Sequence, residues 1–136
     1  MNVKDVELVK VEGDMLKAMF ARQHELELKY KEIESKNLGI PMPLRAEIDN
    51  PLHQYLIKDL MWRIVEELGE AANCLKNKPW KNTHMPTDEE HFMEEIADSM
   101  HFFIQLLLFL GLDAEEACLL YFKKSEVNKF RQRSNY

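Results

Sequence analysis

The sequence predicts an all-α fold, specifically a four-helix bundle that is completed by oligomerisation. Leu, Glu, Lys, Met and Ala dominate the composition and β-branched residues are few, which favours helices over strands. The chain has only four glycines and five prolines, and most of them fall between long segments with helical spacing of apolar residues. With 136 residues the chain can bury one core but not two. We therefore expect a single all-α domain over residues 1–136.

The first predicted helix runs from about Asp14 to Glu34 and follows Gly13. Gln23 falls in the apolar stripe of this helix, whereas His24 points outward. A polar residue in such a stripe needs a hydrogen-bond partner, so Gln23 is a candidate for a specific contact. The other residues of the stripe are apolar, and we expect them to be buried: Met15, Met19, Leu26, Tyr30 and Ile33.

The second predicted helix covers about residues 52–76. A loop with three prolines, about residues 35–51, precedes it, and Pro79 and Pro86 bracket the loop that follows. Its apolar residues recur at helical spacing and define one arc of the helix surface. They are Leu56, Ile57, Leu60, Ile64, Leu68, Ala71 and Leu75.

The third and fourth predicted helices are bounded by capping residues. The pattern Thr87-Asp88-Glu89-Glu90 is a capping box, so we expect Thr87 to start the third helix. Gly111 ends it, and Asp113 with Glu116 forms a second capping box for the last helix. The apolar arc of the third helix consists of Phe92, Ile96, Phe103, Leu107 and Leu110. The inner face of the last helix consists of Ala117, Leu120, Tyr121 and Val127.

Charge and composition exclude several functions. A formal net charge of -6 argues against a protein that binds nucleic-acid backbones. Cys74 and Cys118 form no CxxC pair, so we expect buried free thiols in a reducing cytoplasm. The N-terminus has no signal-peptide pattern, and the longest apolar run, residues 102–112, is shorter than the ~20 residues of a membrane span. We expect a cytoplasmic protein with no nucleic-acid or membrane partner.

Two acidic pairs carry the candidate chemistry. Glu67 and Glu70 lie in the second helix, and Glu95 and Asp98 lie in the third. Residues at i and i+3 are about 60° apart on a helix, so both carboxylates of a pair can reach one ion. Four carboxylates on two facing helices form the oxygen-rich ligand set that Mg²⁺ or Mn²⁺ prefers.

The alternative is that these carboxylates lie on solvated helix faces. Helical phase distinguishes the two interpretations, because Glu66 falls opposite the apolar arc whereas Glu67 lies inside its edge. In the third helix Glu94 points away from the arc and Glu95 flanks it. Half-buried carboxylates repel one another unless a cation pairs them, which favours the metal site.

Polar residues also interrupt the inner face of the last helix and the loop after the second helix. Lys124, Asn128 and Arg131 follow helical spacing among the apolar residues of the last helix. They either form hydrogen bonds and ion pairs between helices, or they line a pocket in which amides recognise a base and cations hold phosphates. Trp80 lies between Lys78 and Lys81, either as a plug of the core or as a stacking platform beside phosphate-binding lysines.

The chain resembles a known family. An ExxE motif, 24 residues and an ExxD motif in an all-α chain are similar to the all-α NTP pyrophosphatase superfamily, which includes the MazG-like proteins and the dimeric dUTPases. Further matches resemble the dimeric dUTPase branch. They are Gln23-His24-Glu25-Leu26, the loop 78–82, His101-Phe102, and the tail from Lys124 to Gln132 that ends in Tyr136. At 134–135 the chain has Ser-Asn where many members have Asn-Gly.

The resemblance implies a role for each matching residue. Mg²⁺, for which Mn²⁺ can substitute, would be held by Glu67, Glu70, Glu95 and Asp98. Base recognition would fall to Gln23 and Asn128, with Trp80 and Phe102 near the ring, and Lys124 and Arg131 would hold phosphates. We add Lys78 and Lys81 as substrate-binding candidates, and we expect Glu67 to act as the catalytic base because it lies deepest in the apolar arc.

The expected reaction is Mg²⁺-dependent hydrolysis of dUTP to dUMP and pyrophosphate. One alternative is a broader pyrophosphatase that acts on dCTP or other deoxynucleoside triphosphates, because a Gln or Asn amide can rotate to bind either uracil or cytosine. Another is a helical bundle without enzymatic activity that binds a partner through its Met-rich first helix. The third helix is apolar almost all round at residues 106–110, so we expect a homo-oligomer, most simply a dimer.

Overall fold

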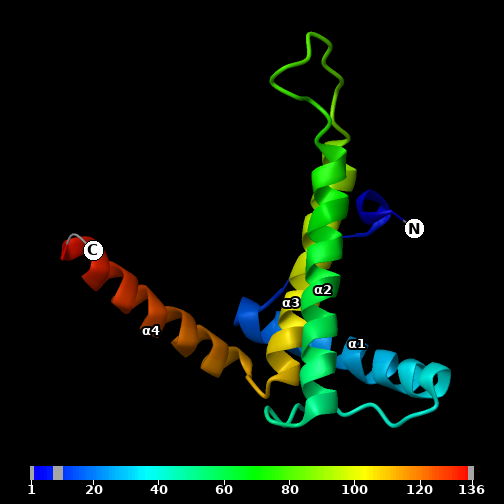
Figure 1. The fold of residues 1–136 in the computed structure, drawn as a ribbon, viewed down its shortest axis with the longest axis vertical. Coiled ribbons are helices and arrows are strands. Elements are labelled where there is room, and N and C mark those ends of the chain that lie inside the picture. Colours follow the sequence, from blue (N-terminus) through cyan, green and yellow to red (C-terminus); the bar gives the residue numbers. More distant parts are fainter. Residues whose placement is uncertain (1, 8–10, 135–136) are drawn as a thin grey trace.

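The computed structural model of the chain describes residues 2–7 and 11–134 and confirms the all-α fold. Over these ranges the structure has no strand (Figure 1). Asn135 and Tyr136 of the tail motif lie outside the described residues. A short 3-10 helix and four α-helices follow one another along the chain: η1 (Val3–Asp5), α1 (Met15–Leu38), α2 (Pro51–Cys74), α3 (Glu89–Phe109) and α4 (Ala114–Arg133).

Each α-helix begins at an Asp or Asn that caps its first turn. Asp14 accepts from the Lys17 N–H at 3.0 Å, and Asn50 precedes Pro51 at the first position of α2. Asp113 accepts from the Glu116 N–H at 2.8 Å, which confirms that cap. The prediction that Thr87 starts the third helix is wrong. Asp88 caps α3 by accepting from the His91 N–H at 3.1 Å, because its carboxylate is favoured by the positive end of the helix dipole.

Two glycines with positive φ end α1 and α3. Gly39 has a φ of 70° and follows Leu38 directly, so α1 runs one turn beyond the predicted end at Glu34. Gly111 has a φ of 85° and comes just after the C-terminal end of α3. A side chain at either position would strain the backbone, so glycine is the residue that allows these turns without strain.

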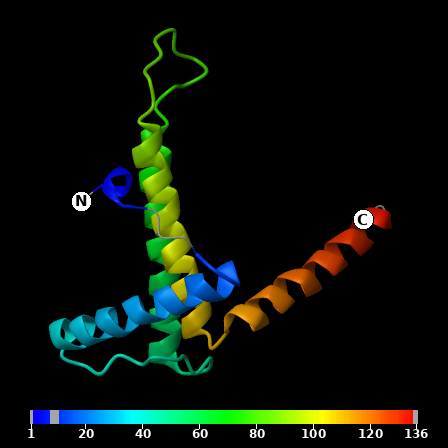
Figure 2. The same ribbon diagram turned by 180° about the vertical axis from the view of Figure 1, so that it is seen from behind.

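The helices pack in a bundle-like arrangement built around an antiparallel pair (Figures 1 and 2). α2 and α3 pack against each other along most of their length, and a long loop over residues 75–88 connects them. α1 crosses this pair and packs against α3. α4 packs chiefly against α1 and diverges from α2 and α3.

The buried apolar residues form two clusters, both of which include residues of α3. One cluster joins α1, α3 and the start of α4: Phe20, Ile104, Leu108 and Ala114. The other joins α2 and α3: Ile57, Leu60, Leu106 and Phe109. The α2–α3 pair is thus fixed at one end by apolar packing, which leaves the other end for polar side chains.

The buried face of α1 differs from the predicted one. Met15, Met19, Tyr30 and Ile33 are exposed, and Leu26 is half-buried. The helix buries Phe20, Gln23, Glu27 and Lys31 instead. Three of these are polar residues that find partners in the interior. Glu27 binds Arg45 and His24, and the Lys31 ammonium lies 4.6 Å from the centre of the Phe109 ring. His24 therefore contacts Glu27 at 2.8 Å instead of pointing freely outward.

Other predicted apolar faces are only partly covered. Leu68 of α2 and Phe103 of α3 are exposed, as are Leu75 and Leu110, which directly follow these helices. The predicted inner face of α4 is also open, with Tyr121 70% exposed, because α4 diverges from the rest of the chain. Cys74 and Cys118 are free thiols as expected, but they are half-buried rather than buried. None of the helices in residues 2–7 and 11–134 is long and apolar enough to span a membrane.

Candidate active site

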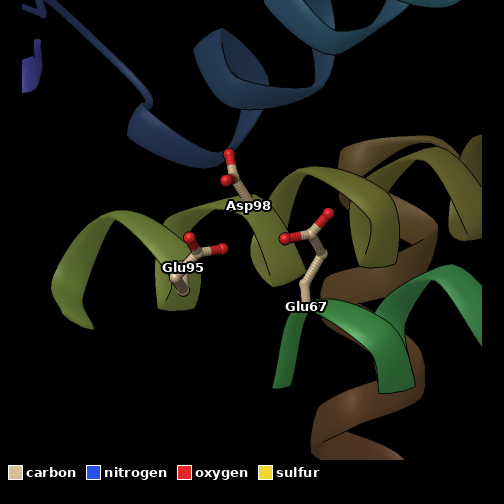
Figure 3. Close-up of side chains that lie close together, drawn as sticks. All are labelled: Glu67, Glu95 and Asp98. Atoms are coloured by element: carbon tan, nitrogen blue, oxygen red, sulfur yellow. The ribbon is translucent and has the colours of Figure 1, made fainter. Parts of the chain in front are cut away.

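Three carboxylates converge where α2 and α3 lie side by side. Glu67 comes from α2, and Glu95 and Asp98 come from α3 (Figure 3). One oxygen of each side chain lies within 4.8 Å of the others. The i, i+3 spacing in α3 places Glu95 and Asp98 on the same side of that helix, and the antiparallel packing brings Glu67 opposite them. The structure thus brings together three of the four carboxylates that the acidic motifs contain.

The three carboxylates differ in burial. Glu95 is only 9% exposed, Glu67 is half-buried and Asp98 is exposed. The expectation that Glu67 lies deepest is therefore wrong. Glu95 lies deeper because Ser99 and Leu106 continue the same side of α3 toward the core, whereas Leu68, next to Glu67, is exposed.

Burial and neighbouring negative charges make it harder for Glu67 to ionise. Burial raises the pKa of Glu67 to about 7, and the nearby carboxylates of Glu95, Glu70 and Asp98 add to the shift. When Glu67 holds a proton, it shares a hydrogen bond with Glu95. When both are ionised neither can donate, and Glu95 Oε2 is buried with no hydrogen-bond partner among the described residues. The site therefore needs either a proton or a cation to be balanced.

These residues fit a divalent cation. The donors are all carboxylate oxygens, the ligands that hard cations prefer, and the buried Glu95 Oε2 lacks a partner that a cation would supply. Glu70 is not part of the group of converging oxygens, although its charge acts on Glu67. It lines an adjoining cavity of about 490 Å³ together with Glu95 and His91, between the end of α2 and the start of α3.

Glu66 and Glu94, which directly precede the two acidic motifs, differ in their exposure to solvent. Glu66 is exposed, as helical phase predicts. Glu94 is half-buried, and its Oε1 accepts from the Val3 N–H at 3.1 Å. The prediction of a solvent-exposed Glu94 is thus wrong, because the short helix η1 packs against α3 at this position.

Among the predicted substrate-binding residues, Gln23 and Phe102 lie in the helix core. Gln23 is 2% exposed and donates through Nε2 to Gln105 Oε1 at 3.3 Å. Phe102 is half-buried on α3, one turn after Asp98, and the Arg63 guanidinium carbon lies 5.9 Å from its ring centre. Phe102 lies on α3, which carries part of the acidic cluster, and Gln23 lies on α1, which packs against α3.

The remaining candidates lie farther out. Trp80 is 77% exposed on the loop between α2 and α3, where Lys78 and Lys81 are exposed as well. Lys124 and Asn128 line a largely apolar cavity of about 870 Å³ between α1, α2, α3 and α4, which also reaches Leu68 beside Glu67 and Ser99 beside Asp98. Arg131 lies in the last turns of α4, the helix that diverges from α2 and α3. The structure therefore does not gather all candidates around one point.

Several residues near the site are missed by sequence reasoning alone. His91 Nε2 lies 3.5 Å from Glu95 Oε1, and their i, i+4 spacing is a signal that could have revealed the pair. Arg63, which faces Phe102, lies four residues before Glu67 on α2. Gln105 is visible in the sequence as the polar residue that interrupts the apolar run 102–112.

The fold and the site together define a class of all-helical protein whose carboxylates converge from two antiparallel helices. Residues 15–117 match the model of a family described as dUTPase, and this match covers more than half of the chain. The chain therefore belongs to this dUTPase family, and the resemblance seen in its motifs is confirmed.

A curated relative supports the same superfamily. The chain is 33% identical over 96 residues to a dCTP pyrophosphatase of Enterobacteria phage LZ5, in a match that covers 59% of this chain and 56% of the relative. The chain thus spans little more than half the length of that protein. No solved structure matches the chain.

Proposed function

We propose that this chain is a Mg²⁺-dependent nucleoside triphosphate pyrophosphohydrolase that converts dUTP to dUMP and pyrophosphate. The observation that carries the proposal is the convergence of Glu67, Glu95 and Asp98 within 4.8 Å, with the pKa of Glu67 raised to about 7. Membership of the dUTPase family supports a nucleotide substrate. An unbalanced carboxylate cluster is costly in a purely structural role, which favours a site for a cation and a phosphate chain.

In this proposal Glu67, Glu95 and Asp98 hold the metal, and Glu70 is a fourth ligand at the edge of the cluster. Mn²⁺ is expected to substitute for Mg²⁺, because both prefer oxygen ligands. The bound cation supplies positive charge that binds phosphate oxygens and offsets the charge that develops during phosphoanhydride cleavage.

Glu67 is the proposed general base. Glu67 is half-buried among the converging carboxylate oxygens, so an attacking water beside the site can reach it and transfer a proton to it. Glu95 is less suited to exchange protons with solvent, since it is more deeply buried and lies beside His91. Its proposed role is to anchor the site from the α3 side.

The substrate-binding proposals follow the family motifs. Gln23 and Asn128 would recognise the base, with Phe102 and Trp80 near the ring. Lys124 and Arg131 would bind the phosphates, assisted by the loop residues Lys78 and Lys81.

We further propose a homo-oligomer, most simply a dimer. The diverging helix α4 exposes several large apolar residues, which a second copy of the chain would cover. They include Leu119, Leu120, Tyr121, Phe122, Val127 and Phe130.

A broader or dCTP-directed pyrophosphatase is the second candidate. The observation that favours it is the similarity to a protein named dCTP pyrophosphatase. The acidic cluster serves either substrate equally, because it contacts phosphates and not the base.

A pyrophosphate-release assay across all dNTPs and NTPs, with and without Mg²⁺, tests the proposal. We expect hydrolysis that stops with EDTA and returns with Mg²⁺ or Mn²⁺ better than with Ca²⁺, and dUTP is expected to be the best substrate. Equal use of dUTP and dCTP would favour the second candidate. No metal-dependent hydrolysis of any nucleotide would leave a helical interaction module as the remaining interpretation.

A further inference from the structure

Two buried amides meet where α1 crosses α3. Gln23 of α1 is 2% exposed and Gln105 of α3 is 1% exposed. Gln23 Nε2 donates to Gln105 Oε1 at 3.3 Å. Their apolar neighbours Phe20, Ile104 and Leu108 form a core cluster that does not need an amide for its packing. The pair is therefore a polar feature placed within an otherwise apolar contact.

The hydrogen bond leaves one polar atom of each amide without a partner among the described residues. Gln23 Oε1 and Gln105 Nε2 are both closed to solvent, and neither has a hydrogen-bond partner among the described residues. Such unpaired groups cost stability and are rare in folded proteins, so each one requires an explanation. The atoms left without a partner among the described residues are an acceptor on Gln23 and a donor on Gln105.

The pair can exist in two orientations. The oxygen and nitrogen of a carboxamide exchange places when the group rotates by about 180°. If both amides rotate together, Gln105 donates to Gln23 instead, and Gln23 then has its NH₂ group free rather than its oxygen. None of the described hydrogen bonds or ion pairs holds either amide in one orientation, apart from the bond between them. The two orientations are therefore close in energy.

Only Gln23 can meet a ligand directly. It lines a cavity of about 640 Å³ between α1 and α3, together with His101 and Met19. Gln105 lies behind it in the core. A base in this cavity meets the free atom of Gln23 when that amide turns toward it, while Gln105 supports the amide from the other side.

We propose that Gln105 is a positioning residue for base recognition and acts through Gln23. The two amides turn together, so the group that Gln105 offers decides which atom Gln23 presents to the base. The ring nitrogen N3 of uracil carries a proton and needs the Gln23 oxygen, whereas N3 of cytosine is an acceptor and needs the Gln23 NH₂. The joint rotation therefore lets one pocket accept uracil and cytosine nucleotides. This inference rests on the proposed pyrophosphatase function and deepens it.

Substitution of Gln105 tests the inference through kcat and KM measured separately for dUTP and dCTP. Gln105→Glu replaces the amide with a carboxyl group. When this group is ionised it can accept a hydrogen bond but not donate one, so it holds the Gln23 NH₂ inward and the Gln23 oxygen toward the base. We expect the ratio of kcat/KM for dUTP over dCTP to rise about tenfold, equivalent to ~1.4 kcal/mol, mainly through KM for dCTP. Assays at pH 7 and pH 9 should show the larger ratio at pH 9, where more of the introduced carboxyl group is ionised.

Two further variants separate positioning from packing. Gln105→Met keeps the volume but removes the partner of Gln23, so it should raise KM for both nucleotides about threefold to tenfold and leave their ratio unchanged. Leu108→Val is the matched control, because it weakens the same α1–α3 contact without touching the amides. It should lower the melting temperature and leave the ratio and both KM values close to wild type.

Three results would overturn the inference, and a fourth would overturn the proposed function on which it rests. If Gln105→Glu changes both nucleotides in parallel at both pH values, as a packing defect would, Gln105 has a structural role only. If Gln105→Glu does not fold and Gln105→Met leaves both KM values unchanged, the positioning role is also excluded. A wild type that hydrolyses dUTP but not dCTP contradicts the joint rotation while the proposed function stands. A wild type that hydrolyses no nucleotide contradicts the proposed function itself.

Discussion

Glu66 and Glu67 are neighbours on α2, but a step of one residue along the helix places them in different surroundings. Glu67 faces Glu95 and Asp98, whereas Glu66 is exposed to solvent. The two side chains have the same chemistry and adjacent positions in one helix. Any difference in their effect on catalysis must therefore come from where the helix directs them.

Substitution of single acidic residues is the first test of the proposed site. Glu67→Gln, Glu95→Gln and Asp98→Asn should each lower kcat/KM for dUTP by at least about a hundredfold, because each removes a charge that holds the cation or accepts a proton. Glu66→Gln is the matched control and should stay within about twofold of wild type, as expected for an exposed charge. Steady-state kinetics with saturating Mg²⁺ would measure both. Equal losses for Glu66→Gln and Glu67→Gln would contradict the assignment of the site.

The raised pKa of Glu67 also predicts how stability depends on pH. The pKa of this carboxyl is about 7 in the folded chain against an ordinary value of 4.5. Between these two values the folded chain holds a proton that the unfolded chain has lost, so the free energy of unfolding falls as pH rises from 4.5 to 7. Well above pH 7 the folded chain has also lost the proton, and this contribution no longer changes with pH.

Thermal unfolding in EDTA should show this effect. Glu67→Gln removes the ionisable group, so its melting temperature should exceed that of wild type by more at pH 8 than at pH 5. Mg²⁺ added at pH 8 should raise the melting temperature of wild type more than that of Glu67→Gln. A difference between the two proteins that stays constant from pH 5 to pH 8 would mean that Glu67 does not titrate in this range.

A site residue can be predicted from the sequence when its partners in the site lie on the same helix or on the helix paired with it. Glu95 and Asp98 share one helix, and Glu67 lies on the helix that pairs with it, so spacing and phase were enough to predict their convergence. Gln105 was seen only as an interruption of an apolar run. Its role depends on Gln23, which is far away in the sequence, and only the crossing of α1 over α3 brings the two together.

At the scale of the helices, the ends were more predictable than the buried faces. Asp113 caps α4 and Gly111 follows α3, as the sequence indicates, because caps and left-handed turns depend on a few adjacent residues. The buried face of α1 could not be predicted from hydrophobic periodicity, because it contains Glu27 and Lys31. Polar residues become buried when distant parts of the chain supply partners, and periodicity contains no information about those partners.

Arg45 is the partner that allows Glu27 to be buried. Its Nη1 lies 2.8 Å from Glu27 Oε1, and Glu27 is fully buried. The Pro-rich loop before α2 is thereby tied to the middle of α1, near the place where Lys31 contacts Phe109. This ion pair links the loop to the helix crossing that holds Gln23.

Removal of Arg45 should therefore destabilise the fold. Arg45→Met leaves the Glu27 carboxylate buried with His24 as its remaining partner, and we expect a loss of about 2–3 kcal/mol in urea unfolding. The double variant Glu27→Gln/Arg45→Met should recover more than half of that loss, because position 27 then no longer carries a buried charge that has lost its Arg45 partner. If the double variant is as unstable as the single one, the loop is held by packing and not by this ion pair.

At the scale of the whole molecule, α4 has more apolar surface than the rest of the chain covers. Ala114 is its only buried residue among those described, and Tyr121 is 70% exposed. An exposed apolar surface of this kind contributes little to stability, and in the proposed oligomer a second chain covers it. The same helix carries Lys124 and Asn128, two of the proposed substrate-binding residues.

If α4 of one subunit completes the site of another, two inactive proteins should restore activity when mixed. Glu67→Gln removes the acidic cluster and Lys124→Ala removes a phosphate-binding cation, so each variant alone should have little activity. After joint refolding in equal amounts, half of the dimers combine both variants, and one of their two sites contains intact residues from each subunit. We therefore expect roughly one quarter of wild-type activity. Light scattering should find a dimer in the wild type. A monomer at micromolar concentration would exclude the oligomer, and a dimer without recovery of activity would mean that α4 serves the site of its own chain.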